Sequence, residues 1–278
     1  MIKTTVTGLF NIMRPFFRNF PNDYVVVDVE TTGIRFYKGV GDFFPNADLI
    51  TQVGWCVVKD SRAINQGSFM LNWLELPQIK RDDMAARLLH TKQMVEMRDG
   101  QPTGKKYHMT LERMESEGVN PLISLKTFKQ DVIDSARENQ MFLVAHNGYH
   151  FDVRMIEQHC NYWLNEKVNF GPNEIFDTGM VEKGSQSSSV PWIGDTVKDW
   201  SYRTYRIRLK NVRWALDKSC VARYRLDERH YLPKDIQGKI DQAHDAGFDS
   251  YLTHLLFEEY KEITAGRRPE PPIPYKEL

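Results

Sequence analysis

The alternation of apolar and polar positions along the chain predicts a sheet of short strands. Five runs rich in apolar and β-branched residues have the length of strands, and they lie at 24–29, 50–58, 63–71, 141–145 and 174–177. The run at 24–29 is uninterrupted, which is typical of a buried strand. Only the polar turn Lys59-Asp60-Ser61 separates the second run from the third, so the chain opens as a meander.

Between and after these runs the apolar residues recur with helical spacing, first from 81 to about 138. The stripes that predict helices are Leu125, Phe128, Val132 and Ala136; Met155, Ile156 and His159; Leu209, Val212 and Leu216; and Phe248, Leu252, Leu255, Phe257 and Tyr260. Strands in a meander, followed by strands that alternate with helices, predict an α/β fold with a mixed sheet flanked by helices.

The chain divides into a central domain at 23–265 and two terminal segments. The segment 1–22 has no acid before Asp23 and begins basic, as packing extensions and mitochondrial presequences do; Pro15 favours the extension. The tail 266–278 is rich in proline and is expected to be extended or disordered. Stretches at 35–46, about 75–104 and 182–197 have the composition of loop insertions. The second of these stretches and the tail are candidate docking segments for a partner.

Composition narrows the classes of function. Lys plus Arg (37) balance Asp plus Glu (37), so nucleic acid can be bound only through a local patch, not through a field over the whole surface. No apolar run has the length of about 18 residues that a membrane span needs. Three cysteines far apart suit neither a disulfide framework nor a zinc site, and an intracellular protein is expected.

The segment Asp28-Val29-Glu30 lies at the end of the first predicted strand. Residues i and i+2 of a strand point to the same face, so the two carboxylates project together while Val29 packs behind them. Two carboxylates side by side on a buried strand repel each other, and a divalent cation relieves this repulsion. Oxygen ligands suit Mg²⁺ or Mn²⁺. Without further matches, a solvated strand end would be the better explanation of the pair.

Three motifs occur in order along the chain. The first is Asp28-Val29-Glu30-Thr31-Thr32-Gly33, the second is Ala145-His146-Asn147-Gly148-Tyr149-His150-Phe151-Asp152, and the third is His244-Asp245-Ala246-Gly247-Phe248-Asp249. With these motifs the chain resembles the DEDDh superfamily of 3′–5′ exonucleases, the proofreading type with an RNase H-like fold. The match covers roughly residues 24 to 262. The resemblance implies an RNase H-like mixed sheet flanked by helices, with loop insertions.

The third motif also carries a geometric statement. Five residues along an ideal helix turn by about 500°, which would place His244 and Asp249 on different sides if both were mid-helix. We therefore expect His244 in the loop before the last helix and Asp249 in its first turns. Position 245 is Asp, whereas the sister branch of the family has Tyr there, so the His branch fits better.

The resemblance implies a catalytic centre with two divalent cations, Mg²⁺ or Mn²⁺. Four carboxylates would hold the cations, and His244 would be the general base for the attacking water, with 5′-mononucleotides released. The four carboxylates are those of Asp28, Glu30, Asp152 and Asp249. The resemblance also implies contacts with the 3′ end of a strand by Thr31, Thr32, Gly33, Ile34, Asn147 and Phe151. His108 lies in a partial match to a further family segment and is predicted to border the site.

A basic segment at 200–213 alternates arginine and lysine with aromatic residues and contains no acid. Such a pattern suits a groove that follows the backbone of single-stranded nucleic acid, and Arg206 and Arg208 are candidate contacts. An amphipathic segment whose aromatic residues pack on the sheet would show the same pattern. Both interpretations remain open at the level of sequence.

These observations predict a metal-dependent 3′–5′ exonuclease that acts on single-stranded or frayed DNA in replication or repair. The same chemistry on the 3′ end of RNA is the close alternative. A non-catalytic module that binds nucleic acid or a polymerase is an alternative of another class. The enzyme would act alone or as the partner of a polymerase.

Overall fold

The computed structural model describes residues 20–98, 100–103, 106–208, 214–216, 219–220, 245–265 and 267. Several sequence predictions concern residues outside these ranges. They are the first nineteen residues of the predicted extension, Leu209 and Val212 of one helical stripe, His244, and the tail apart from Arg267.

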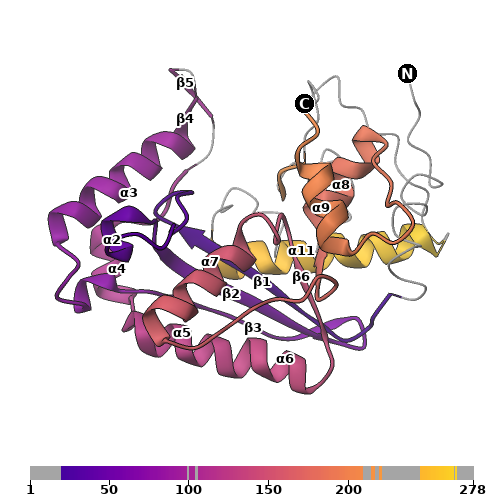
Figure 1. The fold of residues 1–278 in the computed structure, drawn as a ribbon, viewed down its shortest axis with the longest axis horizontal. Coiled ribbons are helices and arrows are strands. Elements are labelled where there is room, and N and C mark those ends of the chain that lie inside the picture. Colours follow the sequence, from indigo (N-terminus) through magenta and orange to yellow (C-terminus); the bar gives the residue numbers. More distant parts are fainter. Residues whose placement is uncertain are drawn as a thin grey trace.

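Five strands form a mixed sheet in the order β3-β2-β1-β6-β7. The strands are β1 (Tyr24–Thr31), β2 (Ile50–Lys59), β3 (Arg62–Met70), β6 (Phe142–Ala145) and β7 (Ile175–Asp177). Strand β2 pairs antiparallel with both β1 and β3, whereas β6 is parallel to β1 and β7 is parallel to β6. All five predicted strands are therefore present, and the mixed sheet is confirmed. Figure 1 labels β1, β2, β3 and β6 of this sheet. A separate hairpin joins β4 (Met97–Arg98) to β5 (Gln101–Pro102).

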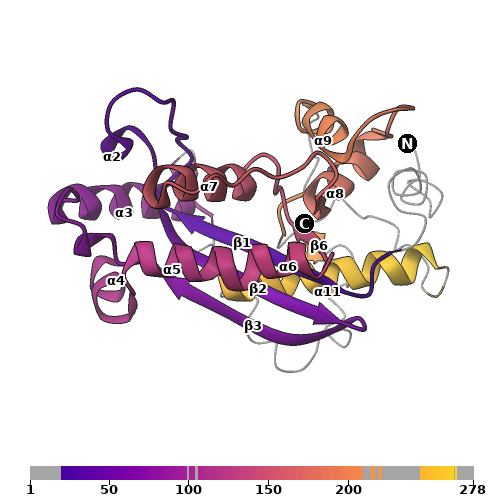
Figure 2. The same ribbon diagram turned by 60° about the horizontal axis from the view of Figure 1, so that its bottom comes forward.

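Helices cover both faces of the sheet. They are α2 (Phe43–Asn46), η1 (Trp73–Glu75), α3 (Arg81–Glu96), α4 (Leu111–Glu117), α5 (Pro121–Phe128), the π-helical η2 (Lys129–Asp134), α6 (Ser135–Glu138), α7 (Asp152–His159), η3 (Cys160–Leu164), α8 (Thr178–Ser187), α9 (Val197–Tyr205) and α11 (Ala246–Thr264). One apolar core lies between the sheet and the helices α5, α6 and α7, and a second lies between the sheet and α8, α9 and α11. Figure 2 shows the long rods of α5–α6 and α11 along the sheet.

The alternation of side chains along β1 divides these two cores. Val25, Val27 and Val29 belong to the core beneath α5–α7, whereas Tyr24 and Val26 belong to the core beneath α11. Because successive side chains of a strand point to opposite faces, Asp28 and Glu30 continue the row of Tyr24 and Val26. The two carboxylates of the first motif therefore lie on the face that α11 covers.

All three expected insertions contribute to the core, the stretch 75–104 through Leu76, Ile79, Met84 and Leu88. The stretch 182–197 begins inside α8, in which the residues from Thr178 to Ser185 are buried. Tyr260 of α11 donates a hydrogen bond to Glu182 at 2.7 Å, which joins the two helices. The stretch 35–46 contributes the buried Phe43 and Phe44. The stretches 35–46 and 182–197 are rich in polar residues or glycine, and this composition does not indicate that they contain packed elements.

Two expectations from composition agree with the structure. Cys56, Cys160 and Cys220 are free and buried. None of the helices in the described parts of the chain combines the length and the apolar character needed to cross a bilayer.

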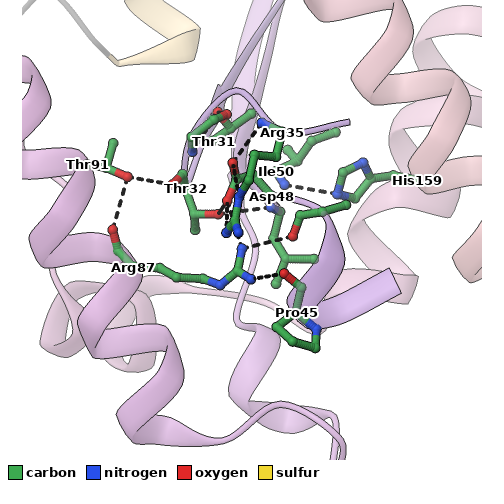
Figure 3. Close-up of polar contacts among 12 residues, drawn as sticks. Thr31, Thr32, Arg35, Pro45, Asp48, Ile50, Arg87, Thr91 and His159 are labelled. Carbon is green, nitrogen blue, oxygen red and sulfur yellow. Dashed lines mark hydrogen bonds and ion pairs between the residues drawn. The ribbon is translucent and has the colours of Figure 1, made fainter. Parts of the chain in front are cut away.

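His159 joins α7 to the sheet through both nitrogens of its ring. Nε2 accepts a hydrogen bond from the backbone N–H of Ile50 at 3.1 Å (Figure 3). Nδ1 lies 2.7 Å from the carbonyl oxygen of Met155. One nitrogen must accept and the other donate, so these contacts require the neutral ring. Burial lowers the pKa of His159 to about 4, as it does for His150 and His254.

We expect the free energy of unfolding to fall as the pH is lowered from about 6.5 towards 4. The pKa of His159 is lowered in the folded state, so the unfolded chain takes up the proton first and is favoured by acid. The full effect of this one residue is about 3 kcal/mol. Urea unfolding at several pH values measures it. The His159→Gln variant, which cannot titrate, should show a smaller loss; a loss as large as in the wild type would contradict the assignment. Replacement of the exposed His90 by Gln is the control.

Candidate active site

Three carboxylates from the two ends of the chain meet at the end of β1. Asp28 and Glu30 of β1 and Asp249 of α11 each offer one oxygen, and these oxygens all lie within 4.8 Å of one another. Asp249 is 9% exposed, and the other two are partly accessible. Asp249 lies in the first turn of α11, as the third motif predicted. The structure therefore brings together three of the four predicted metal ligands.

Asp152, the fourth predicted ligand, lies beside this group at the start of α7. Its Oδ1 accepts a hydrogen bond from the backbone N–H of Val29 at 2.9 Å, so its carboxylate is held against the strand between Asp28 and Glu30. Desolvation raises the pKa of Asp28 well above its usual value, and the charges of Asp152, Asp249 and Glu30 raise it further. Burial likewise raises the pKa of Asp152. Four carboxylates that repel one another thus share a small volume.

The N-terminus of α11 is attached to the sheet by Gln52. Its amide Nε2 donates to Asp245 Oδ2 at 2.9 Å, and its Oε1 accepts from the backbone N–H of Ala246 at 3.2 Å. Asp245 in turn caps the helix, because its Oδ1 accepts from the N–H of Phe248 at 3.1 Å. Gln52 is paired with Glu30 in the β1–β2 ladder. The pairing of Gln52 with Glu30 therefore places the start of α11, the helix that bears Asp249, next to Glu30.

Gly54 allows this helix to approach the sheet closely. It is paired with Asp28 in the ladder, and a Cβ atom at its position would overlap the backbone carbonyl of Ala246 and the nitrogen of Gly247. The backbone at the start of α11 cannot move away from such a Cβ atom while its hydrogen bonds with Gln52 are kept. Asp249 can reach Asp28 because position 54 has no side chain.

Asp177 holds the loop that leads into Asp152. It ends β7 and is 1% exposed, and its Oδ1 accepts hydrogen bonds from the backbone N–H groups of Asn147 at 2.9 Å and Met180 at 3.1 Å. Burial raises its pKa to about 6. Asp177 was not identified from the sequence, although Asp-Thr at the end of the strand predicted at 174–177 is a helix N-cap signal.

Asp48 holds the loop that follows Glu30, and it too was not identified from the sequence. The hydroxyl of Thr32 donates to Asp48 Oδ1 at 3.3 Å and accepts from the N–H of Leu49 at 3.0 Å. Thr91 of α3 donates to the carbonyl oxygen of Thr32 at 2.5 Å (Figure 3). Gly33 has a φ of +150°, and a Cβ there would collide with the Asp48 carboxylate. Hydrogen bonds of Thr32 with Asp48, Leu49 and Thr91 thus fix the loop.

Of the other residues that the motifs predicted at the substrate, Thr31 and Ile34 belong to this loop or lie next to it, and Phe151 packs against it. Thr31 donates from its hydroxyl to the carbonyl oxygen of Gly33 at 2.5 Å, so the hydroxyls of both threonines hold the loop. Ile34 is 67% exposed at its tip. Phe151 packs with its ring edge against Phe36, at 6.3 Å between ring centroids. Asn147 adopts a left-handed backbone conformation with a φ of 69°.

His108 is partly buried, and its neighbour Tyr107 reaches the site. The Tyr107 hydroxyl donates to the carbonyl oxygen of Thr31 at 3.4 Å. Burial raises the pKa of Tyr107, and the charge of Glu30 contributes to the same shift. Tyr107, next to His108, is thus the residue of this segment whose hydroxyl reaches the end of β1.

In the described part of the basic segment at 200–213, some residues pack and others are exposed. Trp200 is buried in the core, as the packing interpretation requires, and Arg203 forms an ion pair with Asp195 at 2.7 Å. Arg206 and Arg208 are exposed and remain accessible to a polyanion. Lys210 and Arg213 lie outside the described residues.

The carboxylate group fits a divalent cation of the hard type. Its ligand atoms are all carboxylate oxygens, which Mg²⁺ and Mn²⁺ prefer. Two ligands on opposite sides of an octahedral Mg²⁺ are about 4 Å apart, so oxygens within 4.8 Å of one another need only a small adjustment. The mutual repulsion at Asp28 is what such a cation would relieve.

We expect Gly54→Ala to lower the free energy of unfolding by about 1–3 kcal/mol, because the added methyl group forces α11 away from β2. Chemical denaturation measures this change. Gly171→Ala is the matched control, since a Cβ there would meet Glu174 only at 3.5 Å, an ordinary contact distance. Equal stability of the two variants would show that the close approach at Gly54 is not needed.

We expect Mg²⁺ to raise the melting temperature of the wild type, by the equivalent of about 2.7 kcal/mol at a hundred times its dissociation constant. Asp28→Asn should be more stable than the wild type in EDTA, since it removes one repelling charge, and should gain less from Mg²⁺. Thermal unfolding with and without Mg²⁺ measures both effects. Asp131→Asn changes an exposed carboxylate and should behave as the wild type. An undiminished Mg²⁺ effect in Asp28→Asn would contradict a cation site here.

No protein family model and no curated protein matches this sequence. Similar solved structures include the zinc-bound form of E. coli exonuclease I with single-stranded DNA, which is 12% identical with a TM-score of 0.46; the match covers 89% of this chain and 42% of that chain. The RNase domain of the yeast Pop2 protein is 12% identical with a TM-score of 0.48, and the match covers 95% of this chain and 85% of that domain.

This chain thus spans less than half of the exonuclease I chain. The descriptions of both structures name nucleases. The five-stranded mixed sheet, with only β2 antiparallel to its neighbours and helices on both faces, is the RNase H-like fold that those motifs implied.

Proposed function

We propose that this protein is a metal-dependent 3′–5′ exonuclease that hydrolyses the terminal phosphodiester of single-stranded or frayed DNA and releases 5′-mononucleotides. The observation that carries the proposal is the convergence of Asp28, Glu30 and Asp249, with Asp152 held beside them by the N–H of Val29. Four carboxylates that repel one another in one small site are costly to assemble, and divalent cations would compensate their charge.

In this proposal Asp28, Glu30, Asp152 and Asp249 hold two divalent cations, Mg²⁺ or Mn²⁺. The cations, when bound, would neutralise charge on the phosphate and favour deprotonation of the attacking water. Asp152 is oriented by the N–H of Val29, and Asp249 by the attachment of α11 to Gln52 through Asp245. These supports hold the carboxylate oxygens in place before the substrate arrives.

His244 is the proposed general base, which takes a proton from the attacking water. An imidazole has an ordinary pKa of about 6.5, close to neutral pH, so it can accept and release a proton there. His244 directly precedes Asp245 in the sequence. The charge of Asp245 contributes to the raised pKa of Asp28, so the residue next to His244 is electrostatically coupled to the carboxylate group.

The 3′ end of the strand would meet the loop after Glu30. Ile34, exposed at its tip, is the proposed apolar wedge between terminal bases, and the backbone around Gly33 is held rigid by Asp48. Thr31, Thr32, Asn147, Phe151 and His108 are proposed to border the terminal nucleotide. Exposed Arg206 and Arg208 are proposed contacts to the phosphates further along the strand.

Digestion of 5′-labelled oligonucleotides with Mg²⁺ tests the proposal. We expect the wild type to shorten single-stranded DNA from its 3′ end, and Asp152→Asn, which keeps the shape of the side chain but removes its charge, to lose about 10³-fold in rate. Asp131→Asn makes the same change on an exposed helix and should leave the rate unaltered. Equal activity of wild type and Asp152→Asn would exclude this site. Preferential digestion of a matched RNA would replace DNA by RNA as the substrate, and binding without cleavage would favour a non-catalytic module.

A further inference from the structure

One buried carboxylate at the edge of the site forms ion pairs with two arginines. Asp48 has a side chain 5% exposed, and its Oδ1 lies 2.7 Å from Arg87 Nη1 and 3.1 Å from Arg35 Nη2. Arg35 also donates from Nε to Oδ2 at 3.3 Å and from its backbone N–H to Oδ2 at 2.8 Å (Figure 3). The group of Asp48, Arg35 and Arg87 therefore has one positive charge more than it needs for neutrality.

Arg87 accounts for the structural part of this group. Its side chain is 11% exposed, it extends from α3, and it also donates to the carbonyl oxygens of Ala47 at 2.9 Å and of Pro45. Arg87 thus compensates the buried Asp48 and ties α3 to the segment 45–48. A buried carboxylate needs one such partner, so the second guanidinium requires a different explanation.

Arg35 differs from Arg87 in exposure and in position. Its side chain is 58% exposed, and it follows Ile34 in the loop that begins directly after Glu30. Within the described part of the chain, Nε and Nη2 donate to Asp48, while Nη1 makes no hydrogen bond. The guanidinium is therefore oriented by a buried anion and still has N–H groups to offer at the surface.

We propose that Arg35 binds a phosphate group of the nucleic acid strand whose 3′ end lies at the carboxylates; this inference rests on the proposed function. A guanidinium matches the geometry of a phosphate through paired N–H donors. Because Asp48 already restricts the side chain, less rotamer freedom is lost on binding than for a free surface arginine. The excess positive charge lies on the loop that follows Glu30, where it would attract a phosphate towards the negatively charged carboxylates.

Arg35→Gln tests this inference, with Arg62→Gln on exposed β3 as the matched control. In Mg²⁺-dependent digestion we expect Arg35→Gln to raise KM about 10-fold, a typical cost for one lost charged contact, with kcat within about twofold of the wild type. Affinity for a fluorescein-labelled oligothymidylate is measured by anisotropy over a series of KCl concentrations, with Asp152→Asn present in every protein to prevent cleavage. The slope of log Kd against log salt should fall by about 0.7. Arg35→Lys should restore the slope, because it restores the charge.

The outcomes separate this inference from the proposed function. If the wild type cleaves but Arg35→Gln keeps its KM, its Kd and its salt slope, the proposed function stands and Arg35 is no phosphate contact. If Arg35→Gln instead lowers kcat and the melting temperature while the salt slope is unchanged, the residue only holds the loop, and the inference is overturned. If the wild type neither cleaves nor binds DNA or RNA, the proposed function fails and the inference fails with it.

Discussion

The carboxylate group at the end of β1 is the constraint on which the rest of the structure depends. Asp28 is desolvated and feels the charges of Asp152, Asp249 and Glu30, so the chain must hold these groups together against their repulsion. It does so with neutral or backbone groups: the N–H of Val29 holds Asp152, and Gln52 holds the start of α11. The site is thus assembled by its supports rather than by mutual attraction of its members.

Two further buried carboxylates serve the loops around this group. Asp177 accepts backbone N–H groups on the approach to Asp152, and Asp48 does the same for the loop after Glu30. Each fixes the backbone of a segment that is not part of a helix or strand. Ordering such a segment costs conformational entropy, and these hydrogen bonds offset that cost. The loop held by Asp48 also carries the exposed Arg35 and Ile34, so support and surface contact are combined within a few residues.

The five strands, the last helix and the carboxylate group could be predicted because periodicity and motif order record them. Val25, Val27 and Val29 alternate with Tyr24 and Val26 between two cores, and the motifs name the acidic residues. Gln52, Gly54 and Asp48 could not be found in this way. Their roles depend on contacts with α3 or α11, elements distant in sequence, and a single glutamine or glycine within a strand has no pattern of its own. The composition predicts an insertion where the second half of α8 lies, because this stretch is rich in glycine and serine. In the structure Tyr260 and its neighbours bury it.

The order of the elements along the chain has a consequence for synthesis. Strand β1 is made before α11, which follows it by more than two hundred residues and supplies the third oxygen. In a ribosome-bound polypeptide from which α11 has not yet emerged, Asp28 and Glu30 are present without Asp249. The apolar face of β1 that α11 covers in the folded protein is then exposed. Completion of the second core and completion of the acidic centre are therefore one event. A truncated translation product would carry neither.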